Sequence, residues 1–410
     1  MRFSATNGAL SGAPHSNNKT SCALQFLGAG LVAPSIFGKT LAVWNYHNPV
    51  HVTTGINSLN KLPALLAGRS CLLVTFPEAQ ALGIVDRVRV LLGSQLRGVI
   101  DTIQPNPDVQ WLAPLYEKVQ HDYADVPVIV ALGGGSAIDS AKALLCATPN
   151  GKFEELLEVL EQGSQLPATS DNITHKALIA IPTTAGTGSE VTPWATIWDQ
   201  VGSRKHSLHQ ACTWPEAAII DAALMASLPA GATLASGLDA LSHALESIWN
   251  INRNPVSMAL AVQAARQVMV ALPELMSDLG NLQLRGDMAQ AALLAGLAFS
   301  NTKTALAHSL SYDITLHHGV PHGIACSFSL PVILGMALGS DAQVDAALLS
   351  IFDTSTPAIA QQRLSDFLQS LGVATDPTQY GVQPQEWSAM VNKAANGPRG
   401  RNFIRSVASA

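Results

Sequence analysis

Short apolar runs alternate with amphipathic helical patterns through the first half of the chain, and this alternation limits the folds open to it. Amphipathic segments such as Pro77–Leu92 and Leu112–Tyr123 lie between runs that are typical of buried strands. The predicted strands are Val50–Thr54, Cys71–Phe76, Gly98–Ile103, Val126–Leu132, Ala177–Ile181 and Ala217–Asp221. Strands that alternate with helices predict a parallel sheet with crossover helices. Thr192–Asp199 and Lys205–His209 predict an added hairpin.

The composition and residue pattern of the chain change in its second half. Residues 222–406 are rich in alanine, leucine and methionine and contain helix-length blocks with few β-branched runs. We therefore predict an α/β amino-terminal domain over residues 44–221 and an all-α carboxy-terminal domain over residues 222–410, with the active site in a cleft between them. The first twenty residues are polar and lack the apolar stretch of a secretory signal, so residues 1–43 are expected to be a disordered extension.

Composition excludes several classes of protein. With 48% hydrophobic and 13% charged residues, most of the 410-residue chain can be buried, which excludes a disordered protein. The net charge is −6 and lysine and arginine do not cluster, so nucleic acid is not expected as a partner. No apolar run approaches the ~18 residues of a membrane span, so no membrane partner is expected. The five cysteines are scattered without a CxxC pair, which fits a reducing cytoplasm.

A glycine turn follows the fourth predicted strand. The apolar run ends in GGGS at residues 133–136, and a helical pattern begins there. Backbone amides at such a helix start can face a pyrophosphate, assisted by the helix dipole. Ser136 is the expected N-cap, with Asp139 three residues later. By itself, this turn is equally compatible with a tight turn that binds nothing.

A second polar loop follows the fifth predicted strand. It reads PTTAGTGSE over residues 182–190 and brings hydroxyl groups and exposed amides together. Such a loop suits the ribose and nicotinamide end of a dinucleotide; the alternative is a loop rich in capping residues without a ligand. The two loops together favour a dinucleotide cofactor.

One carboxylate and three imidazoles in the second half form a complete ligand set for one divalent metal. Asp239 and His243 are four residues apart, so they share a helical face. On one unbroken helix, His308 and His322 would be ~21 Å apart. Because metal–ligand bonds are only ~2.0–2.2 Å long, the chain has to break between them, and GVP at residues 319–321 is a suitable place. Taken singly, each histidine is as well explained as a core or surface residue.

With GGGSAIDSAK, PTTAGTGSE, SGLDALSHALES and PHG in this order, the chain resembles the iron-containing (group III) alcohol dehydrogenase family over residues 45–405. The resemblance implies a dinucleotide-binding α/β domain, a helical domain, and NAD(P) with Fe²⁺ or Zn²⁺ in the cleft. It also implies that the four residues above bind the metal, and it favours a homodimer. The expected cofactor-binding residues are Asn106, Gly134, Gly135, Ser136, Ala137, Asp139, Thr183, Thr184 and Lys205.

Three positions depart from the usual pattern of this family. Phe76 stands where many members have an aspartate for the adenosine ribose, which leaves the choice between NAD and NADP open. Tyr312 stands where many members have a histidine that is assigned to a proton relay. Lys303 replaces a small residue five positions before His308. A lysine and a tyrosine beside a metal favour a substrate that carries its own negative charge.

The predicted substrate is therefore a small anionic aldehyde. We place Lys303 on the helix that carries His308, and we expect Arg401 and Asn402 in the cationic carboxy-terminal stretch to bind the anion. A surface lysine and a solvated tail are the alternatives. The sequence from Lys303 to Gly323 looks most like the phosphonoacetaldehyde reductase branch of the family, also called 2-hydroxyethylphosphonate dehydrogenases.

The predicted reaction is the reduction of this aldehyde to an alcohol. The metal would polarise the carbonyl and NAD(P)H would donate hydride. Tyr312, His318 or water would deliver the proton, although His318 is also explained as a helix-end residue. Alternatives are a general alcohol dehydrogenase and a reductase of maleylacetate or succinic semialdehyde. A lyase of the 3-dehydroquinate synthase type and a non-catalytic binding protein are more distant ones.

Overall fold

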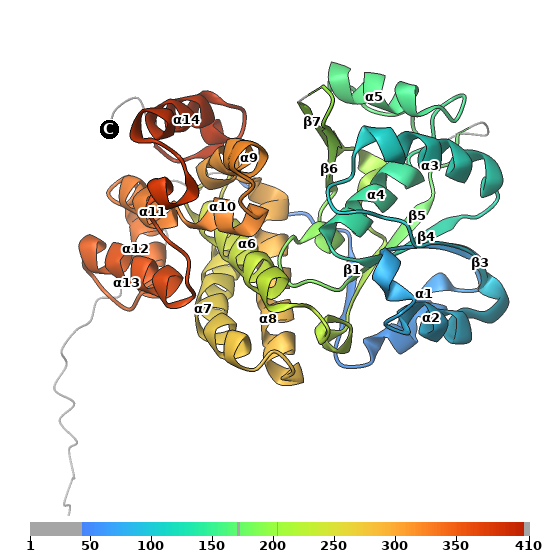
Figure 1. The fold of residues 1–410 in the computed structure, drawn as a ribbon, viewed down its shortest axis with the longest axis horizontal. Coiled ribbons are helices and arrows are strands. Elements are labelled where there is room, and N and C mark those ends of the chain that lie inside the picture. The colour runs from blue at the N-terminus through green and yellow to red at the C-terminus, as the bar shows by residue number, and fades with distance from the viewer. Residues whose placement is uncertain (1–42, 170–172, 203, 406–410) are drawn as a thin grey trace, which may run out of the picture. The chain divides into compact units, whose positions relative to one another are not determined.

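A six-stranded parallel sheet forms the centre of the first half of the chain in this computed structural model (Figure 1). Its strand order is β1-β8-β5-β4-β2-β3. The strands are β1 (His51–Thr54), β2 (Cys71–Thr75), β3 (Leu96–Ile100), β4 (Val128–Gly133), β5 (Ala177–Pro182) and β8 (Ala217–Ile220). The predicted parallel sheet is confirmed: every predicted strand is present, and the strands differ from the prediction only in where they begin and end.

The structure describes residues 43–169, 173–202 and 204–405. These residues all belong to one unit of the fold, which begins at Ala42. The extension expected over residues 1–43 lies outside the described residues, apart from Val43.

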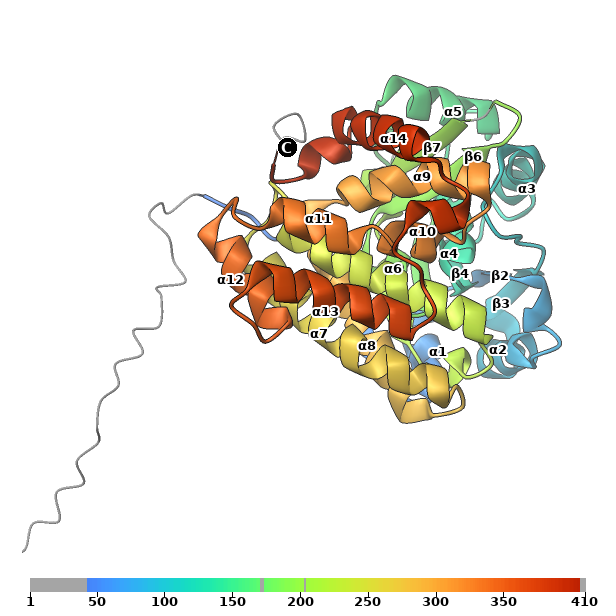
Figure 2. The same ribbon diagram turned by 60° about the vertical axis from the view of Figure 1, so that its left-hand side comes forward.

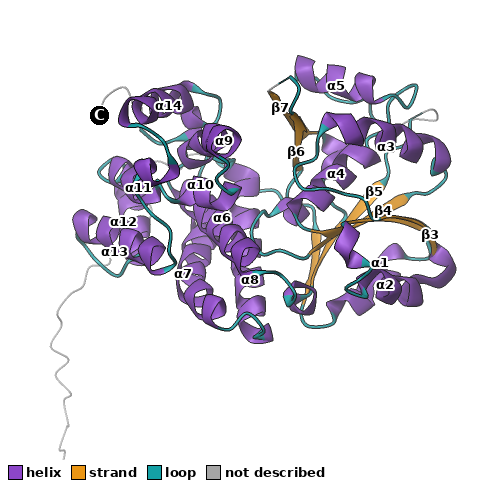
Figure 3. Cartoon of the chain, in the orientation of Figure 1, coloured by secondary structure: helices purple, strands orange, loops and turns teal. Residues whose placement is uncertain are grey.

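Helices cover both faces of the sheet (Figure 3). Side chains of a strand point alternately to its two faces, so Ile129 and Ala131 of β4 pack against one group of helices, and Val130 and Leu132 pack against the other. The first group is α3 (Val109–Asp122), α4 (Gly135–Leu145) and α5 (Phe153–Gln162); the second is α1 (Leu62–Leu66) and α2 (Ile84–Leu92). The sheet is therefore buried on both sides, as expected of a parallel sheet.

Two predicted segments of this half can be compared directly with the structure. The helix predicted over Pro77–Leu92 is wrong in extent, because Gly83 has a left-handed φ of 70° and separates a 3₁₀ turn, η2 (Pro77–Ala79), from α2. The predicted hairpin is present as β6 (Trp194–Asp199) and β7 (Arg204–His209), which pair in antiparallel fashion.

The second half of the chain is helical. The described residues from 222 to 405 contain no strand beyond an isolated bridge between Asn250 and Phe403. The helices are α6 (Ala230–Ile248), α7 (Pro255–Ser277), α8 (Leu282–Thr302), α9 (Leu306–His318), α10 (His322–Ser327), α11 (Leu330–Ala337), α12 (Ala342–Ile351), α13 (Pro357–Ser370) and α14 (Pro384–Asn396). Helices α6, α7 and α8 pack on one another, α12 packs on α6 and α7, and α14 packs on α9 (Figure 2).

Helix α7 is long and apolar enough to cross a bilayer, by length and composition only. The sequence analysis found no such segment, because Arg266 and Glu274 interrupt its apolar residues. Its inward side chains, among them Ala265, Val268 and Leu272, belong to the helical core. One such helix is weak evidence of a membrane span, and α7 packs on both α6 and α8.

Candidate active site

A cavity of about 1380 Å³ lies between the α/β half and the helical half. Both predicted cofactor loops and the β6–β7 hairpin line it from the first half, and α6, α9 and the start of α10 line it from the second. The structure brings most of the predicted site residues to this cavity: Asn106, Gly134, Gly135, Ser136, Ala137, Asp139, Thr183, Thr184, Lys205, Asp239, His243, Lys303, His308, Tyr312, His322 and Asn402. It does not bring His318 or Arg401 there.

The glycine turn places the start of helix α4 at the cavity wall. Gly134 is the N-cap of α4, so the predicted N-cap at Ser136 is wrong. Ser136 already lies in the first helical turn, where its hydroxyl accepts a hydrogen bond from the Asn106 amide (3.1 Å). The first amides of a helix have no partner within the helix, and here no side chain of the turn covers them. These amides are therefore free to meet the pyrophosphate that the sequence analysis expects at this turn, and that role stays a prediction.

The two cofactor loops touch each other, and glycine makes the contact possible. A Cβ atom added at Gly135 would lie 2.8 Å from Cγ2 of Thr187, and one at Gly134 would lie 3.2 Å from Cγ2 of Thr184. Any larger side chain would push the second loop away from the first. The close approach brings the helix amides and the threonine hydroxyls to one end of the cavity.

Two ionisable residues of α4, Asp139 and the buried Lys142, hold this end in place. Asp139 accepts hydrogen bonds from the Ser189 hydroxyl (2.6 Å) and the Thr196 amide (2.9 Å), so it braces the loop and hairpin and does not cap a helix. Lys142 donates to the carbonyls of Ser189 (2.7 Å) and Trp194 (2.7 Å). Burial lowers the pKa of Lys142 to about 8, although nearby Asp139 and Glu190 oppose the change.

The four predicted metal ligands converge at the end of the cavity that the helical half lines. Oδ1 of Asp239 lies 3.3 Å from Nε2 of His308, 3.8 Å from Nε2 of His243 and 3.9 Å from Nε2 of His322. The chain breaks between α9 and α10 as predicted, at Gly319 with a φ of 67°. Asp239 Oδ1 and His308 Nε2 are buried, and neither has a hydrogen-bond partner among the described residues.

This arrangement fits a metal ion. With metal–ligand bonds of ~2.0–2.2 Å, two ligands of a tetrahedral ion lie ~3.3–3.6 Å apart. The Asp239–His308 distance is already in that range, and the other two exceed it by a few tenths of an ångström. A bound cation would also give both buried, unpartnered atoms a partner.

Glycine residues bring the ligands together. An added Cβ at Gly323 would overlap the carbonyl of Ala235, so only glycine lets α10 lie this close to α6. The same holds for Gly186, which approaches the backbone of Ser236 on α6. The glycines of PHG and PTTAGTG therefore position His322 and the contacts of His243.

Hydrogen bonds orient the imidazoles of the cluster. His308 donates from Nδ1 to Glu246 (2.7 Å), and His243 donates from Nδ1 to the Gly186 carbonyl (3.2 Å). His322 Nδ1 lies 3.4 Å from the Ser311 hydroxyl. Because Nδ1 is engaged in each ring, Nε2 is the ring nitrogen left on the side of Asp239, which is how metal-binding histidines are usually held.

Sequence reasoning missed Glu246. Its carboxylate is buried and also accepts hydrogen bonds from the amides of Ala305, Ala307 and His308 at the start of α9. Glu246 follows His243 by three residues and Asp239 by seven, so it shares their helical face. That spacing was the available signal.

The charges of the cluster depend on one another. Burial raises the pKa of Asp239, but the three surrounding imidazoles outweigh it and hold this pKa well below its ordinary value. Burial lowers the pKa of His243 to about 4, against the attraction of Asp239. Burial also lowers the pKa of His308, but Cys326 and Glu246 outweigh it and raise this pKa above its ordinary value. A bound metal would take over the attraction to the carboxylate and require a neutral His308.

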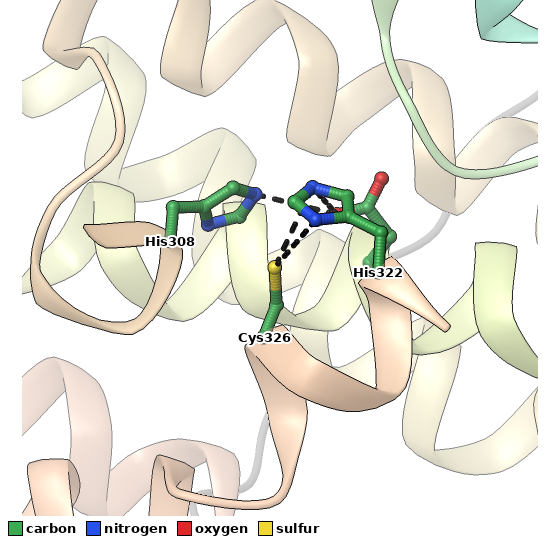
Figure 4. Close-up of side chains that lie close together, drawn as sticks. His308, His322 and Cys326 are labelled. Atoms are coloured by element: carbon green, nitrogen blue, oxygen red, sulfur yellow. Dashed lines mark hydrogen bonds and ion pairs between the residues drawn. The ribbon is translucent and has the colours of Figure 1, made fainter. Parts of the chain in front are cut away.

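A cysteine, Cys326, also belongs to the cluster; the sequence analysis treated it only as a free thiol. Cys326 is buried on α10, four residues after His322, and its Sγ lies 3.6 Å from Nε2 of His322 (Figure 4). Burial raises the pKa of Cys326, but His308 and His322 outweigh it and lower this pKa to about 7. The spacing of four residues on one helix was a signal here as well.

Cationic side chains gather beside the cluster, around Tyr312. Lys205 Nζ lies 3.7 Å from the centre of the Tyr312 ring, and the central carbon (Cζ) of the Arg399 guanidinium lies 4.8 Å from it. The Tyr312 ring itself is stacked with His322 at 6.3 Å between centroids. Lys303 lies 5.6 Å from the Trp194 ring on the cavity wall. Of the three cationic residues Lys205, Lys303 and Arg399, the sequence analysis had not assigned Arg399 to the site.

The predicted placements of Lys303 and His318 are wrong. Lys303 is not on the helix of His308. It is the C-cap of α8, with a φ of 67°. The next helix, α9, begins at Leu306, and the Glu246 carboxylate accepts hydrogen bonds from the free amides at the start of α9. His318 binds Glu386 (2.9 Å) outside the cavity. Ten residues separate it from His308, which rotates its side chain by about 280° around the helix.

The carboxy-terminal stretch contributes differently from the prediction. Arg401 is exposed and does not line the cavity. In a 3₁₀ turn such as η8 (Gly400–Asn402), side chains two positions apart differ in direction by about 240°. Arg399, two residues earlier, lines the cavity instead. Asn402 lines the cavity, but its amide donates to the Thr304 carbonyl (2.8 Å) and so braces the α8–α9 connection.

Comparison with protein families gives two adjacent matches. Residues 49–222 match the family described as iron-containing alcohol dehydrogenase. Residues 233–406 match the carboxy-terminal part of the Fe-containing alcohol dehydrogenase family. The matches cover the α/β half and the helical half, including both cofactor loops and the four predicted metal ligands.

Individual relatives extend over both halves of the chain. The probable alcohol dehydrogenase EutG of Salmonella typhimurium is 32% identical over 65% of this chain, which spans 66% of that relative, slightly less than two thirds. The 1,3-propanediol dehydrogenase of Klebsiella pneumoniae is 30% identical over 80% of this chain and 86% of its own length. The crystal structure of sulfoacetaldehyde reductase from Bifidobacterium kashiwanohense in complex with NAD⁺ has a TM-score of 0.81 and 26% identity, and covers 89% of this chain and 96% of that one.

Proposed function

Because the chain belongs to the iron-containing alcohol dehydrogenase family, we propose that it reduces a small anionic aldehyde with NAD(P)H in a metal-dependent reaction. Family membership makes it an oxidoreductase, and NAD(P) and iron are the cofactors of this family. The anionic substrate is our proposal, with phosphonoacetaldehyde, reduced to 2-hydroxyethylphosphonate, as the first compound to test.

One observation carries the choice of an anionic substrate. Lys205, Lys303 and Arg399 line the cavity near the metal cluster, and none of them is within ion-pair distance of a carboxylate among the described residues. Burial lowers the pKa of Lys205, which reflects the cost of an unpaired cation in this position. A phosphonate would pair with these cations and offset that cost.

The geometry suits a short substrate. Lys205 and Arg399 both contact the Tyr312 ring, and that ring stacks with the predicted metal ligand His322. A two-carbon aldehyde has its carbonyl and its anionic group close together, so both must be bound within a short distance of each other. The sulfoacetaldehyde reductase neighbour acts on a compound of this kind, which supports the proposed substrate class.

The residues divide the work of the reaction between them. When bound, the metal supplies a Lewis acid and NAD(P)H supplies hydride. Asp239, His243, His308 and His322 would hold the metal, and the amides of the glycine turn would hold the pyrophosphate of the cofactor. The substrate would then lie between the cluster and the cations.

Tyr312 is the proposed proton donor. Burial raises its pKa, but Lys205 and Arg399 outweigh burial and lower it below the ordinary value of a phenol. The hydroxyl therefore releases its proton more readily, which favours protonation of the developing alkoxide. His318, the other predicted donor, lies outside the cavity.

The test compares cofactor oxidation by the Fe²⁺-loaded protein with phosphonoacetaldehyde, sulfoacetaldehyde and propionaldehyde, each with NADH and with NADPH. The proposal expects a large kcat/KM advantage for an anionic aldehyde over propionaldehyde. Equal or faster turnover of propionaldehyde would leave a general alcohol dehydrogenase. A reaction that uses NAD⁺ without net consumption would favour the lyase alternative.

A further inference from the structure

A fifth donor lies within the predicted metal cluster. The thiol of Cys326 projects from α10 toward the rings of His308 and His322 (Figure 4). Its Sγ and the donor atoms of Asp239, His308 and His322 all lie within 4.8 Å of one another. These four residues come from three helices, so the tertiary fold and not a local turn brings them together.

The distances are those of a ligand shell. With bonds of ~2.3 Å to sulfur and ~2.0–2.1 Å to nitrogen, a tetrahedral ion places its sulfur and nitrogen ligands ~3.6 Å apart. Sγ of Cys326 lies 3.6 Å from Nε2 of His322, and Asp239 Oδ1 lies 3.3 Å from His308 Nε2. The separations of both pairs therefore match ligands of one ion. Because Sγ also lies 3.8 Å from Nδ1 of His322, this ring has to turn to direct Nε2 at an ion that it shares with the sulfur.

A second observation points to a ligand at this place. Oδ1 of Asp239 and Nε2 of His308 are buried, belong to side chains that are more than nine-tenths buried, and have no hydrogen-bond partner among the described residues. Both atoms point into the space that Cys326 adjoins. A cysteine with only a packing role would be surrounded by apolar side chains, whereas Cys326 faces ionisable ones.

We propose that Cys326 is an inner-sphere ligand of the metal, in addition to the predicted ligands Asp239, His243, His308 and His322. The inference rests on the proposed metal-dependent function and specifies the chemistry of its metal site. The thiol releases its proton to solvent as the sulfur–metal bond forms, so no other reactant is needed. Since thiolate is a soft ligand, the site selects thiophilic ions such as Zn²⁺, Co²⁺ and Cd²⁺ over hard ions such as Mn²⁺.

Cobalt spectroscopy of the full-length protein tests this directly. The metal-free protein is loaded with Co²⁺ alone, and we expect a thiolate-to-cobalt charge-transfer band in the near ultraviolet. C326S should lose the band and still bind Co²⁺ through the remaining ligands. C212S removes a half-buried thiol outside the cluster and should keep it.

The outcomes separate this inference from the proposed function. Bound Co²⁺ without a charge-transfer band in the unmodified protein would overturn Cys326 as a ligand, and this result does not depend on whether C326S folds. Failure to bind Co²⁺ at all would instead overturn the metal site and with it the proposed function.

Metal competition provides a second measurement. Loss of an inner ligand should cost at least as much as loss of an outer-shell partner, so C326S should weaken Cd²⁺ binding by about tenfold or more. Mn²⁺ binding should change far less, because manganese prefers oxygen ligands. An equal loss of affinity for both ions would mean that Cys326 shapes the site without binding the metal.

Discussion

The two ends of the cavity are built from different parts of the polypeptide. The cofactor end consists mainly of backbone: glycines, helix amides and a loop that can approach because Gly135 has no side chain. The metal end consists of side chains: Asp239 and His308 are buried, and a hydrogen bond from Nδ1 to Glu246 orients His308. A site made of backbone is damaged by adding atoms, and one made of side chains is damaged by removing them.

Each end nevertheless also depends on a buried charge. Lys142 donates to backbone carbonyls and fixes the second cofactor loop. Glu246 accepts from backbone amides and from His308 and fixes the start of α9. Neither residue needs to touch a ligand, so their substitution tests how far each end depends on its support.

The largest effect is expected from removing a ligand. The His322→Ala variant should lose metal and lower kcat by about 10³-fold, because the metal contributes several kcal/mol to the transition state. The His322 side chain is 42% exposed, so the fold should remain intact. Metal content, kcat and circular dichroism check this. His318→Ala is the matched control with full activity, and turnover by metal-free His322→Ala would refute the assignment.

A smaller effect is expected when a residue that orients a metal ligand is replaced. Glu246→Gln keeps the size of the side chain but replaces a carboxylate that accepts from His308 Nδ1. Metal affinity should fall by about 10–100-fold, as for other outer-shell partners. Competition with a chelator measures it. Unchanged affinity would show that Glu246 serves only to cap α9.

The proposed binding of the substrate's anionic group can be tested by substituting two arginines, one that lines the cavity and one that does not. Arg399→Ala should lower kcat/KM for phosphonoacetaldehyde by about 10–100-fold, since a charge-assisted contact contributes ~1.5–3 kcal/mol, and should change propionaldehyde reduction little. Arg401→Ala removes an exposed arginine from the same stretch and should leave both rates as they are. Equal losses for the two aldehydes with Arg399→Ala would remove its proposed role.

The cofactor end contains a buried acid that makes stability depend on pH. Burial raises the pKa of Glu190 to about 7 from an ordinary 4.5, so the folded protein binds more protons than the unfolded chain in this window. The free energy of unfolding should therefore fall as pH rises from 4.5 to 7, by about 1–3 kcal/mol at this residue. Glu190→Gln should flatten the profile measured by urea denaturation. The same slope in the variant would assign it to other groups.

Adding one methyl group should damage the backbone-built end. In Gly135→Ala, the new Cβ would lie 2.8 Å from Thr187 and push the second loop away, so KM for the cofactor should rise about tenfold. Gly231→Ala places a methyl group where nothing lies within 4 Å and should leave KM unchanged. Tight cofactor binding by Gly135→Ala would show that the loops can separate without loss.

Much of the fold could be predicted because its signals are local. The strands and the hairpin are contiguous patterns, and GGGS after β4 identifies a helix start at the end of a strand. The helix boundaries were harder, since Gly83 divides one predicted helix and Lys303 ends another. Those breaks depend on left-handed backbone conformations that the side-chain pattern does not reveal.

The sequence by itself determined the sheet, the helical half and the residues with metal-binding chemistry, because spacing along a strand or helix sets which side chains share a face. Only the tertiary structure decided that Arg399 and not Arg401 faces the cavity, that His318 faces away, and that Cys326 and Glu246 adjoin the cluster. These outcomes depend on how α6, α9 and α10 pack together. Local spacing places Glu246 beside His243 and Cys326 beside His322 on their own helices, but it does not encode which helices meet, because contacts between distant segments are set by packing across the whole core.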